Sequence, residues 1–243
     1  MNTNLSNNQN SANKISYQAI IFLGPPGSGK GTQADLLAKR LDFYHLETSE
    51  LIEKKLSGIK SGAFEIVDGQ KYFLEEEKRL RESGEIMSPY LIASWVKNKV
   101  RRLANDGEGV IFSGSPRTLQ EAQEVIPLLK ELYGRNKIII ISVKQNLEVS
   151  LHRNSKRRTC SLMRHPILFN EETAGLTICP LDGSALVARK DDDPEIIKAR
   201  LKKYKERTLP VINYLKTQDL IMKEVDGERN VSEVFNDIIA KIG

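Results

Sequence analysis

The stretch Gly24-Pro25-Pro26-Gly27-Ser28-Gly29-Lys30-Gly31-Thr32 decides the fold of this chain. It matches the phosphate-loop pattern of Gly, four residues, Gly and Lys, with the hydroxyl residue one place later than in the simplest form, at Thr32. Glycines let successive backbone N–H groups turn inward on phosphate oxygens, and a helix that begins there presents its positive end to the same anion. The stretch therefore predicts a nucleotide phosphate site in which Lys30 reaches the β- and γ-phosphates.

The residues on either side of the loop support this interpretation over a glycine turn that merely packs a strand on a helix. Tyr17 to Leu23 is nearly all apolar, as in a strand of a parallel sheet that is buried on both faces. After the loop, Ala34, Leu37, Ala38 and Leu41 recur at helical spacing. Strand, loop and helix thus follow in the order that a phosphate loop requires.

Further apolar runs indicate how the rest of the chain folds. Residues 110–112, 138–143 and, more weakly, 220–225 have the character of buried strands. Helices lie between them, with Ser88 and Pro89 at the start of one, and Asn230 and Glu233 capping another. Strands that alternate with helices predict an α/β fold with a parallel sheet, which here is a three-layer core of the phosphate-loop NTPase type.

Two stretches interrupt the alternation of strands and helices and predict insertions over the sheet. Residues 49–84 are helical and charged with no strand-like run, and residues 157–190 are irregular, with Cys, Pro and Gly signals. The predicted segments are a disordered tail (1–16), a core (17–47, 85–156 and 191–243) and two insertions, one helical (48–84) and one irregular (157–190).

Composition excludes several classes of protein. The 243 residues are 40% hydrophobic and 28% charged, with a net charge of +5, as in a globular chain that suits an anionic ligand. The longest apolar runs fall short of the ~20 residues of a membrane helix, and the Asn-rich start fits neither a signal nor a transit peptide. One Trp and scattered basic residues give little support for nucleic-acid binding. We therefore expect a soluble, cytoplasmic monomer whose two cysteines stay reduced.

The phosphate loop, extended to Gln33, resembles the opening of adenylate kinases and related nucleoside monophosphate kinases. Other motifs follow in the family's order. Ser113 to Thr118 resembles Asp-Gly-Phe-Pro-Arg-Thr, and Arg153 with Arg157-Arg158 resembles the family's basic helix end. Arg189 to Asp192 with Arg200 resembles the lid exit, and Val225 to Gly227 resembles the turn beside the adenine of ATP. The resemblance spans about residues 17–243, and it implies that 48–84 is an acceptor-binding insertion and 157–190 a mobile lid.

The resemblance implies reversible phosphoryl transfer from MgATP to AMP, which gives two ADP. Such transfer needs mostly alignment and positive charge, and the planar, permanently charged fork of arginine supplies both. By resemblance, the catalytic residues are Lys30, Arg117, Arg157, Arg189, Arg200 and Asp191. Those that bind ATP are Gly27, Ser28, Gly29, Lys30, Gly31, Thr32, Arg153, Arg157 and Arg229. Those that bind AMP are Thr48, Glu85, Ile86, Met87, Gly114, Ser115, Pro116, Arg117, Glu121, Arg189 and Arg200.

Three positions depart from the family pattern. Ser113 replaces an Asp that helps to hold the water shell of Mg²⁺, and Glu53 replaces an Arg that meets the acceptor phosphate, for which Lys54, Lys55 or Lys71 could compensate. Glu121 replaces a Gln that pairs with the acceptor adenine; an ionised Glu offers only acceptors and would match guanine, unless it is solvated and Gln120 or Gln123 faces the base. Two alternatives to an adenylate kinase therefore remain. One is a kinase for another monophosphate such as GMP, and the other is a catalytically weakened nucleotide-binding sensor.

The predicted lid contains four side chains that could bind a metal. Cys160-x-x-Met163 and Cys179-x-x-Asp182 resemble the zinc-bearing lid of some family members, in which four Cys, or three Cys and an Asp, bind the ion. Zinc needs four tetrahedral ligands and a Met thioether is a poor one, so His165 would have to serve with Cys160, Cys179 and Asp182. On ligand count the sequence favours a metal-free knot over structural zinc.

Overall fold

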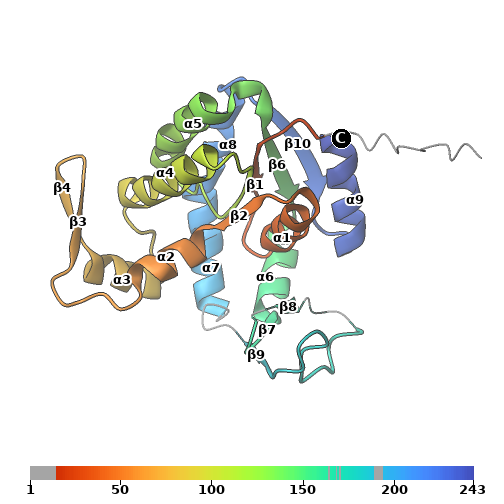
Figure 1. Ribbon diagram of the computed structural model, residues 1–243. Helices are drawn as coiled ribbons and strands as arrows, with labels where there is room; N and C mark the ends of the chain where they lie inside the picture. The colour runs from red at the N-terminus through yellow and green to blue at the C-terminus, as the bar shows by residue number, and fades with distance from the viewer. Residues whose placement is uncertain (1–14, 164, 168, 170, 189–193) are drawn as a thin grey trace, which may run out of the picture.

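The centre of the fold is a parallel sheet with the phosphate-loop strand in its middle. The structure, a computed structural model, describes residues 15–163, 165–167, 169, 171–188 and 194–243 (Figure 1). The sheet has five strands in the order β10-β6-β1-β5-β2, all parallel. They are β1 (Ala19–Leu23), β2 (Tyr44–Glu47), β5 (Val110–Ser113), β6 (Ile138–Lys144) and β10 (Ile221–Asp226). Because β1 is central, the loop that follows it opens at the middle of the sheet's carboxyl edge.

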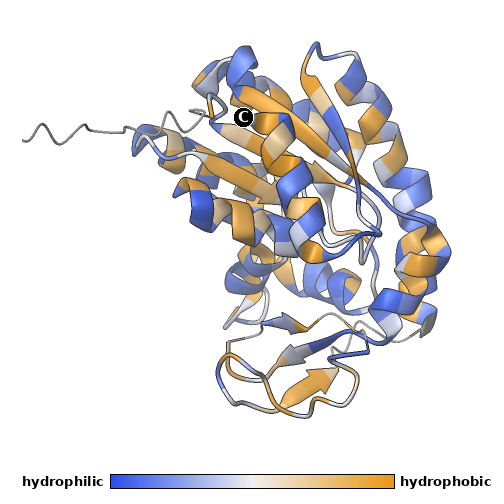
Figure 2. Cartoon of the chain, turned by 90° about the vertical axis from the view of Figure 1, so that its right-hand side faces the viewer, coloured by the Kyte–Doolittle hydropathy of each residue, from blue (hydrophilic) through white to orange (hydrophobic). Residues whose placement is uncertain are grey.

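Helices cover both faces of the sheet, which gives the predicted three layers. Ile20 and Phe22 of β1 pack with α1 (Lys30–Leu41) and α9 (Val231–Ile242), while Ala19 and Ile21 pack with α4 (Pro89–Asn105), α5 (Leu119–Tyr133) and α8 (Leu209–Lys216). The alternation follows from the two-residue period of a strand. Figure 2 shows the hydrophobic strands enclosed by helices whose outer faces are hydrophilic. No helix in the described ranges is long and apolar enough to cross a membrane.

The prediction that residues 49–84 contain no strand is wrong. Between α2 (Thr48–Leu56) and α3 (Leu74–Glu82) the chain forms a hairpin of β3 (Phe64–Val67) and β4 (Gln70–Phe73), which projects from the sheet at the left of Figure 1. Asp68 and Gly69 both have positive φ, 50° and 80°, as a type I′ turn requires. The Asp-Gly pair between two short runs is the sequence signal that marks this hairpin.

The predicted lid segment lies below the core in Figure 1 and has a small sheet of its own. Its antiparallel strands are β7 (Arg158–Cys160), β8 (Pro166–Ile167) and β9 (Leu186–Ala188), in the order β8-β7-β9. Helices α6 (Leu147–Ser155) and α7 (Pro194–Lys203) connect this segment to the core, and α7 continues through the π-helical turn Tyr204–Thr208 into α8. A short 3-10 turn, Arg135–Lys137, leads into β6.

The strand predictions for residues 17–23, 110–112, 138–143 and 220–225 are confirmed, but β2 was not predicted. Its four residues, Tyr-His-Leu-Glu, lie at the sheet edge and only Leu46 is buried, so they form no apolar run. The capping box of Asn230 and Glu233 is confirmed on α9. Pro89 begins α4 as predicted; the Ser88 hydroxyl makes no cap and instead donates to Glu77.

Candidate active site

The phosphate loop has the backbone shape of an anion site. Gly29, with φ of 84°, is the N-cap of α1, and the described residues place no side-chain cap on this helix end. A Cβ built at Gly29 or Gly31 would meet no atom within 4 Å, so the space beside the loop is open to a ligand. The Nζ of Lys30 donates to the Pro25 carbonyl at 2.7 Å and lies 3.4 Å from the Ser28 hydroxyl. The open N–H groups and the ammonium thus lie side by side, as phosphate binding requires.

Three arginines from distant parts of the chain surround the charge of Lys30. Burial, and then the positive charges of Arg117, Arg200 and Arg157 in that order of effect, together lower the pKa of Lys30 to about 7. Arg117 follows β5, Arg157 follows α6 and Arg200 lies on α7. Their combined field at one ammonium shows that the structure brings together four of the six residues predicted as catalytic. The other two, Arg189 and Asp191, lie outside the described residues.

Helix α6 and the turn after β10 lie against the phosphate loop. The Ser150 hydroxyl donates to the Pro26 carbonyl, and Arg153 donates to the carbonyls of Gly227 and Glu228 at 2.6 and 2.8 Å. The Arg153 guanidinium therefore holds the turn that the family resemblance places beside the adenine of ATP. Arg229 pairs with Asp237 of α9 at 2.7 Å, at the edge of the same turn.

The loop after β5 meets the start of α2 at the predicted acceptor side. Gly114 has φ of 95°, and a Cβ there would lie 3.0 Å from Arg117 Nη2 and 3.7 Å from Thr48 Cβ. Arg117 Nε donates to the Gly114 carbonyl at 2.6 Å. Thr48 is 1% exposed, and its hydroxyl has no hydrogen-bond partner among the described residues. A buried hydroxyl without a partner is costly, so it points to a ligand contact here.

Glu121 is buried next to this loop and stabilises it through hydrogen bonds. Its carboxylate accepts from the Ser115 hydroxyl and the Arg117 N–H, both at 3.0 Å, and from the Thr118 hydroxyl at 3.4 Å. The side chain is 2% exposed, so the alternative in which Glu121 is solvated is wrong. Burial raises the pKa of the Glu121 carboxyl, while the hydrogen bonds from the loop and the Arg117 charge oppose that rise.

The remaining predicted residues of the acceptor side lie along the same edge. Met87 is buried, and Lys203 of α7 donates to the Gly84 carbonyl at 2.8 Å and pairs with Glu85 at 2.7 Å, next to Ile86. The Ser113 hydroxyl is buried and lies 2.7 Å from His45 Nε2. Sequence reasoning missed His45, because its strand carries no apolar run.

Sequence reasoning also missed Arg81, the last arginine of α3. Its Nη2 lies 3.4 Å from the Ser49 carbonyl and 3.5 Å from Glu53 Oε2. Lys55 and Lys71, predicted to compensate for Glu53, have other partners: Lys55 pairs with Glu65, and Lys71 lies over the rings of Phe64 and Phe73. The pairing of Arg81 with Glu53 depends on how α3 packs on α2, which no local sequence pattern encodes.

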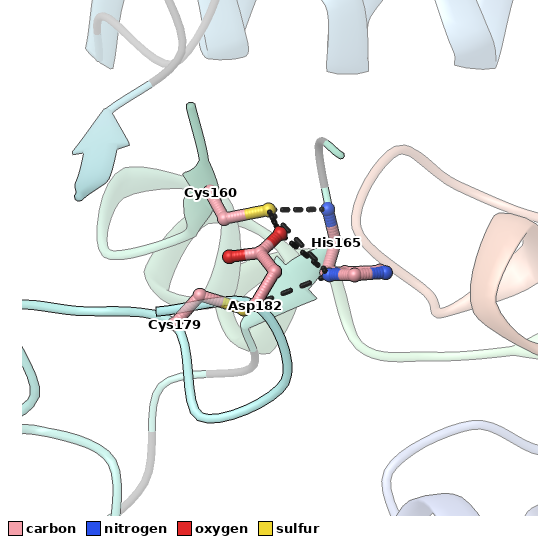
Figure 3. Close-up of side chains that lie close together, drawn as sticks. All are labelled: Cys160, His165, Cys179 and Asp182. Atoms are coloured by element: carbon pink, nitrogen blue, oxygen red, sulfur yellow. Dashed lines mark hydrogen bonds and ion pairs between the residues drawn. The ribbon is translucent and has the colours of Figure 1, made fainter. Parts of the chain in front are cut away.

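Four side chains in the lid segment point toward one another (Figure 3). The ligand atoms of Cys160, His165, Cys179 and Asp182 all lie within 4.8 Å of one another. His165 Nδ1 is 3.5 Å from Cys160 Sγ, 3.6 Å from Cys179 Sγ and 3.3 Å from Asp182 Oδ2. In a tetrahedral zinc site the bond lengths place neighbouring ligand atoms about 3.6 Å apart. The chemistry and spacing of these four donors fit zinc.

Hydrogen bonds around this cluster fix the ligand orientation. The Ser184 N–H and hydroxyl donate to Asp182 Oδ1 at 2.9 and 2.7 Å, which leaves Oδ2 facing Cys160. The His165 N–H donates to Cys160 Sγ at 3.1 Å. Hydrogen bonds from Cys160 and Ser184 hold the pKa of the Asp182 carboxyl well below its usual range. Such outer contacts are typical of metal ligands.

Comparison with known proteins identifies the family. A scan against protein-family models matches residues 22–220 to "Adenylate kinase". The chain is 32% identical over 227 residues to an adenylate kinase of Mycoplasma capricolum, covering 90% of this chain and 96% of that protein. Adenylate kinases of Desulforamulus reducens and Clostridium tetani are both 30% identical, over 225 and 228 residues, covering 92% of this chain and 99% and 98% of those proteins. With the phosphate loop and the arginines around Lys30, these matches show that the chain belongs to the adenylate kinase family of nucleoside monophosphate kinases.

Proposed function

We propose that the chain transfers the terminal phosphoryl group of MgATP to AMP, giving two ADP, beside Lys30. The observation that carries this proposal is the convergence of Arg117, Arg157 and Arg200 on the Lys30 ammonium. Positive charge from separate elements at one point stabilises the oxygens of a transferring phosphoryl group. Binding ATP alone would not need charges from so many elements.

On the donor side, the phosphate loop and the α1 N-terminus bind the ATP phosphates. Arg153 orders the turn at Gly227, against which the adenine lies, and Lys30 neutralises charge on the β- and γ-phosphates. Mg²⁺ arrives with ATP as part of the substrate.

On the acceptor side, Thr48, Gly114 and Arg117 bind the monophosphate. The buried Thr48 hydroxyl has no partner in the described part of the chain and is free to bond to a nucleotide, and Arg117 lies against the Gly114 backbone beside it. The hydrogen bonds of Glu121 to the loop support a bracing role for this residue. We therefore favour AMP over a GMP-type acceptor, and an enzyme over a nucleotide sensor.

Steady-state transfer from MgATP to AMP, GMP, CMP and UMP tests this function, with the Lys30→Met variant as the blank. We expect rapid ADP formation with AMP, and Glu121→Gln to keep the preference for AMP. Activity with GMP that Glu121→Gln removes would instead make Glu121 the residue that selects the base. ATP binding without transfer to any acceptor would support the sensor.

The lowered pKa of Lys30 predicts that the protein takes up a proton when ATP binds. With its pKa at about 7, Lys30 is mostly neutral at pH 8 in the free protein, and phosphate favours the charged form, so its pKa rises on binding. At pH 8, where the ATP phosphates are already ionised, binding should take up about one proton, and affinity should weaken as pH rises above 7. Calorimetry in two buffers of different ionisation enthalpy measures this. Lys30→Arg, which stays charged, should show no uptake; equal uptake in both proteins would assign the proton to another group.

We propose that Cys160, His165, Cys179 and Asp182 bind one structural zinc ion. Protein purified without chelators should contain about one equivalent of zinc, and Cys179→Ser should reduce it to about a tenth of an equivalent or less and lower the Tm. Met163→Ala is the matched control, because Met163 is 64% exposed and near the cluster in sequence without being a ligand. Zinc-free wild-type protein that rejects added zinc would contradict the site.

We also propose that the enzyme acts as a cytoplasmic monomer. The apolar faces of α1, α4, α5, α8 and α9 are all used against one sheet. Cys160 and Cys179 form no disulfide, which suits a reducing compartment. Sedimentation equilibrium should give a mass near 27.4 kDa; a dimer would contradict the monomer.

A further inference from the structure

A second arginine, Arg81 of α3, lies near the start of α2, besides Arg117, which is already placed at the acceptor side. Arg81 extends from the last turn of α3 to the first turn of α2, where its Nη2 lies 3.4 Å from the Ser49 carbonyl. The side chain is 34% exposed, so it is partly desolvated while its guanidinium remains accessible. Its position therefore depends on where α3 lies relative to α2.

Arg81 and Arg117 both lie near the start of α2. Arg117 lies against Gly114, whose Cβ position is 3.7 Å from Thr48 Cβ, and Arg81 contacts Ser49, the next residue after Thr48. The Thr48 hydroxyl is buried without a partner among the described residues. Two guanidinium groups, a helix start and an unpartnered hydroxyl are the groups that bind a phosphate monoester.

Glu53 fixes the guanidinium of Arg81. Its Oε2 lies 3.5 Å from Arg81 Nη2, one helical turn after Ser49 on α2. A carboxylate near a phosphate would repel it, but this one lies against an arginine and is 54% exposed, so solvent screens the repulsion. Its effect is to hold Arg81 over the first turn of α2.

We propose that Arg81 binds the phosphate of the acceptor nucleotide and that Glu53 positions its guanidinium. This inference rests on the proposed function, because it assigns a residue to the acceptor side of that reaction. It also explains how this chain binds an acceptor phosphate with an acidic residue at position 53. The arginine reaches the site from α3 and not from α2.

The test compares Arg81→Ala with Arg79→Ala, an equal loss of charge at an exposed position of the same helix. Arg81→Ala should weaken AMP binding in calorimetry, and raise the KM for AMP, about ten- to hundredfold, since charge-assisted hydrogen bonds to phosphate are lost. The KM for ATP should change less than about threefold, and Arg79→Ala should match wild type. A melting curve checks that the variants fold.

Two further variants separate binding from a structural role. Glu53→Gln should raise the KM for AMP less than Arg81→Ala does, because Arg81 remains but is held less firmly. In the Arg81→Ala background, Glu53→Arg should recover part of the AMP affinity by placing a guanidinium on α2. Equal AMP affinity in the Arg81→Ala and Arg79→Ala variants would overturn the inference, as would equal increases in the KM for AMP and ATP.

Calorimetry keeps this test separate from that of the proposed function. Wild-type protein that binds AMP but forms no ADP would refute the proposed function, while weaker AMP binding by Arg81→Ala would still support the role of Arg81. Turnover of AMP that is indifferent to Arg81 would refute only the inference. Wild-type protein that does not bind AMP would refute both.

Discussion

Lys30→Met is expected to lower kcat for transfer from MgATP to AMP by about three orders of magnitude. The phosphate loop places the Lys30 ammonium beside the open N–H groups of α1. We expect no neighbouring side chain to move into its place and supply the same positive charge. The arginines whose charges act on Lys30 come from other elements. The variant should fold normally, because within the described residues the Lys30 ammonium makes hydrogen bonds only to the loop itself.

The control for this experiment is Lys39→Met, on the same helix. Lys39 is exposed and pairs with Asp35 at 2.8 Å, so its loss should change kcat less than about twofold. Rapid-quench measurement of a single turnover separates chemistry from product release. A loss of less than about tenfold in the Lys30→Met variant would contradict the role assigned to Lys30.

The sequence alone predicts the core of this fold because its signals there are local. A buried strand, a glycine-rich loop and a helical stripe follow one another between Tyr17 and Leu41, and each is determined by neighbours within a few residues. β2 and the β3–β4 hairpin were missed for opposite reasons. β2 is too short and polar to form an apolar run, while the hairpin has a clear turn signal in Asp68-Gly69 that the surrounding charged residues obscured.

The acceptor side could be predicted only in part, because its contacts cross between elements. The motif around Arg117 is contiguous in sequence and was found. Arg81 contacts Ser49, 32 residues away, only because α3 turns back on α2 after the hairpin. The lid cluster is a similar case: ligand count argued against zinc, whereas the distances from His165 to the other three side chains suit a fourth ligand.

Arg117→Ala is expected to lower kcat/KM for AMP by about a thousandfold, and Arg117→Lys should recover little of it. The guanidinium has a planar fork that can bind two phosphate oxygens, and the backbone of its loop is held by Glu121, so an ammonium on a flexible stem cannot take its place. Initial rates with varied AMP at saturating ATP measure the loss. A change confined to the KM for ATP would contradict the assignment to the acceptor side.

The same variant predicts a second change that activity alone does not show. Among the three arginines, Arg117 has the largest effect on the pKa of Lys30. Its removal should therefore raise that pKa above about 7. More Lys30 is then charged at pH 8 before ATP binds, and proton uptake on binding should fall below the wild-type value of about one. Calorimetry of Arg117→Ala in two buffers measures it. Unchanged proton uptake would mean that the charge of Arg117 does not act on Lys30. It would contradict the grouping of arginines around Lys30 on which the proposed function rests.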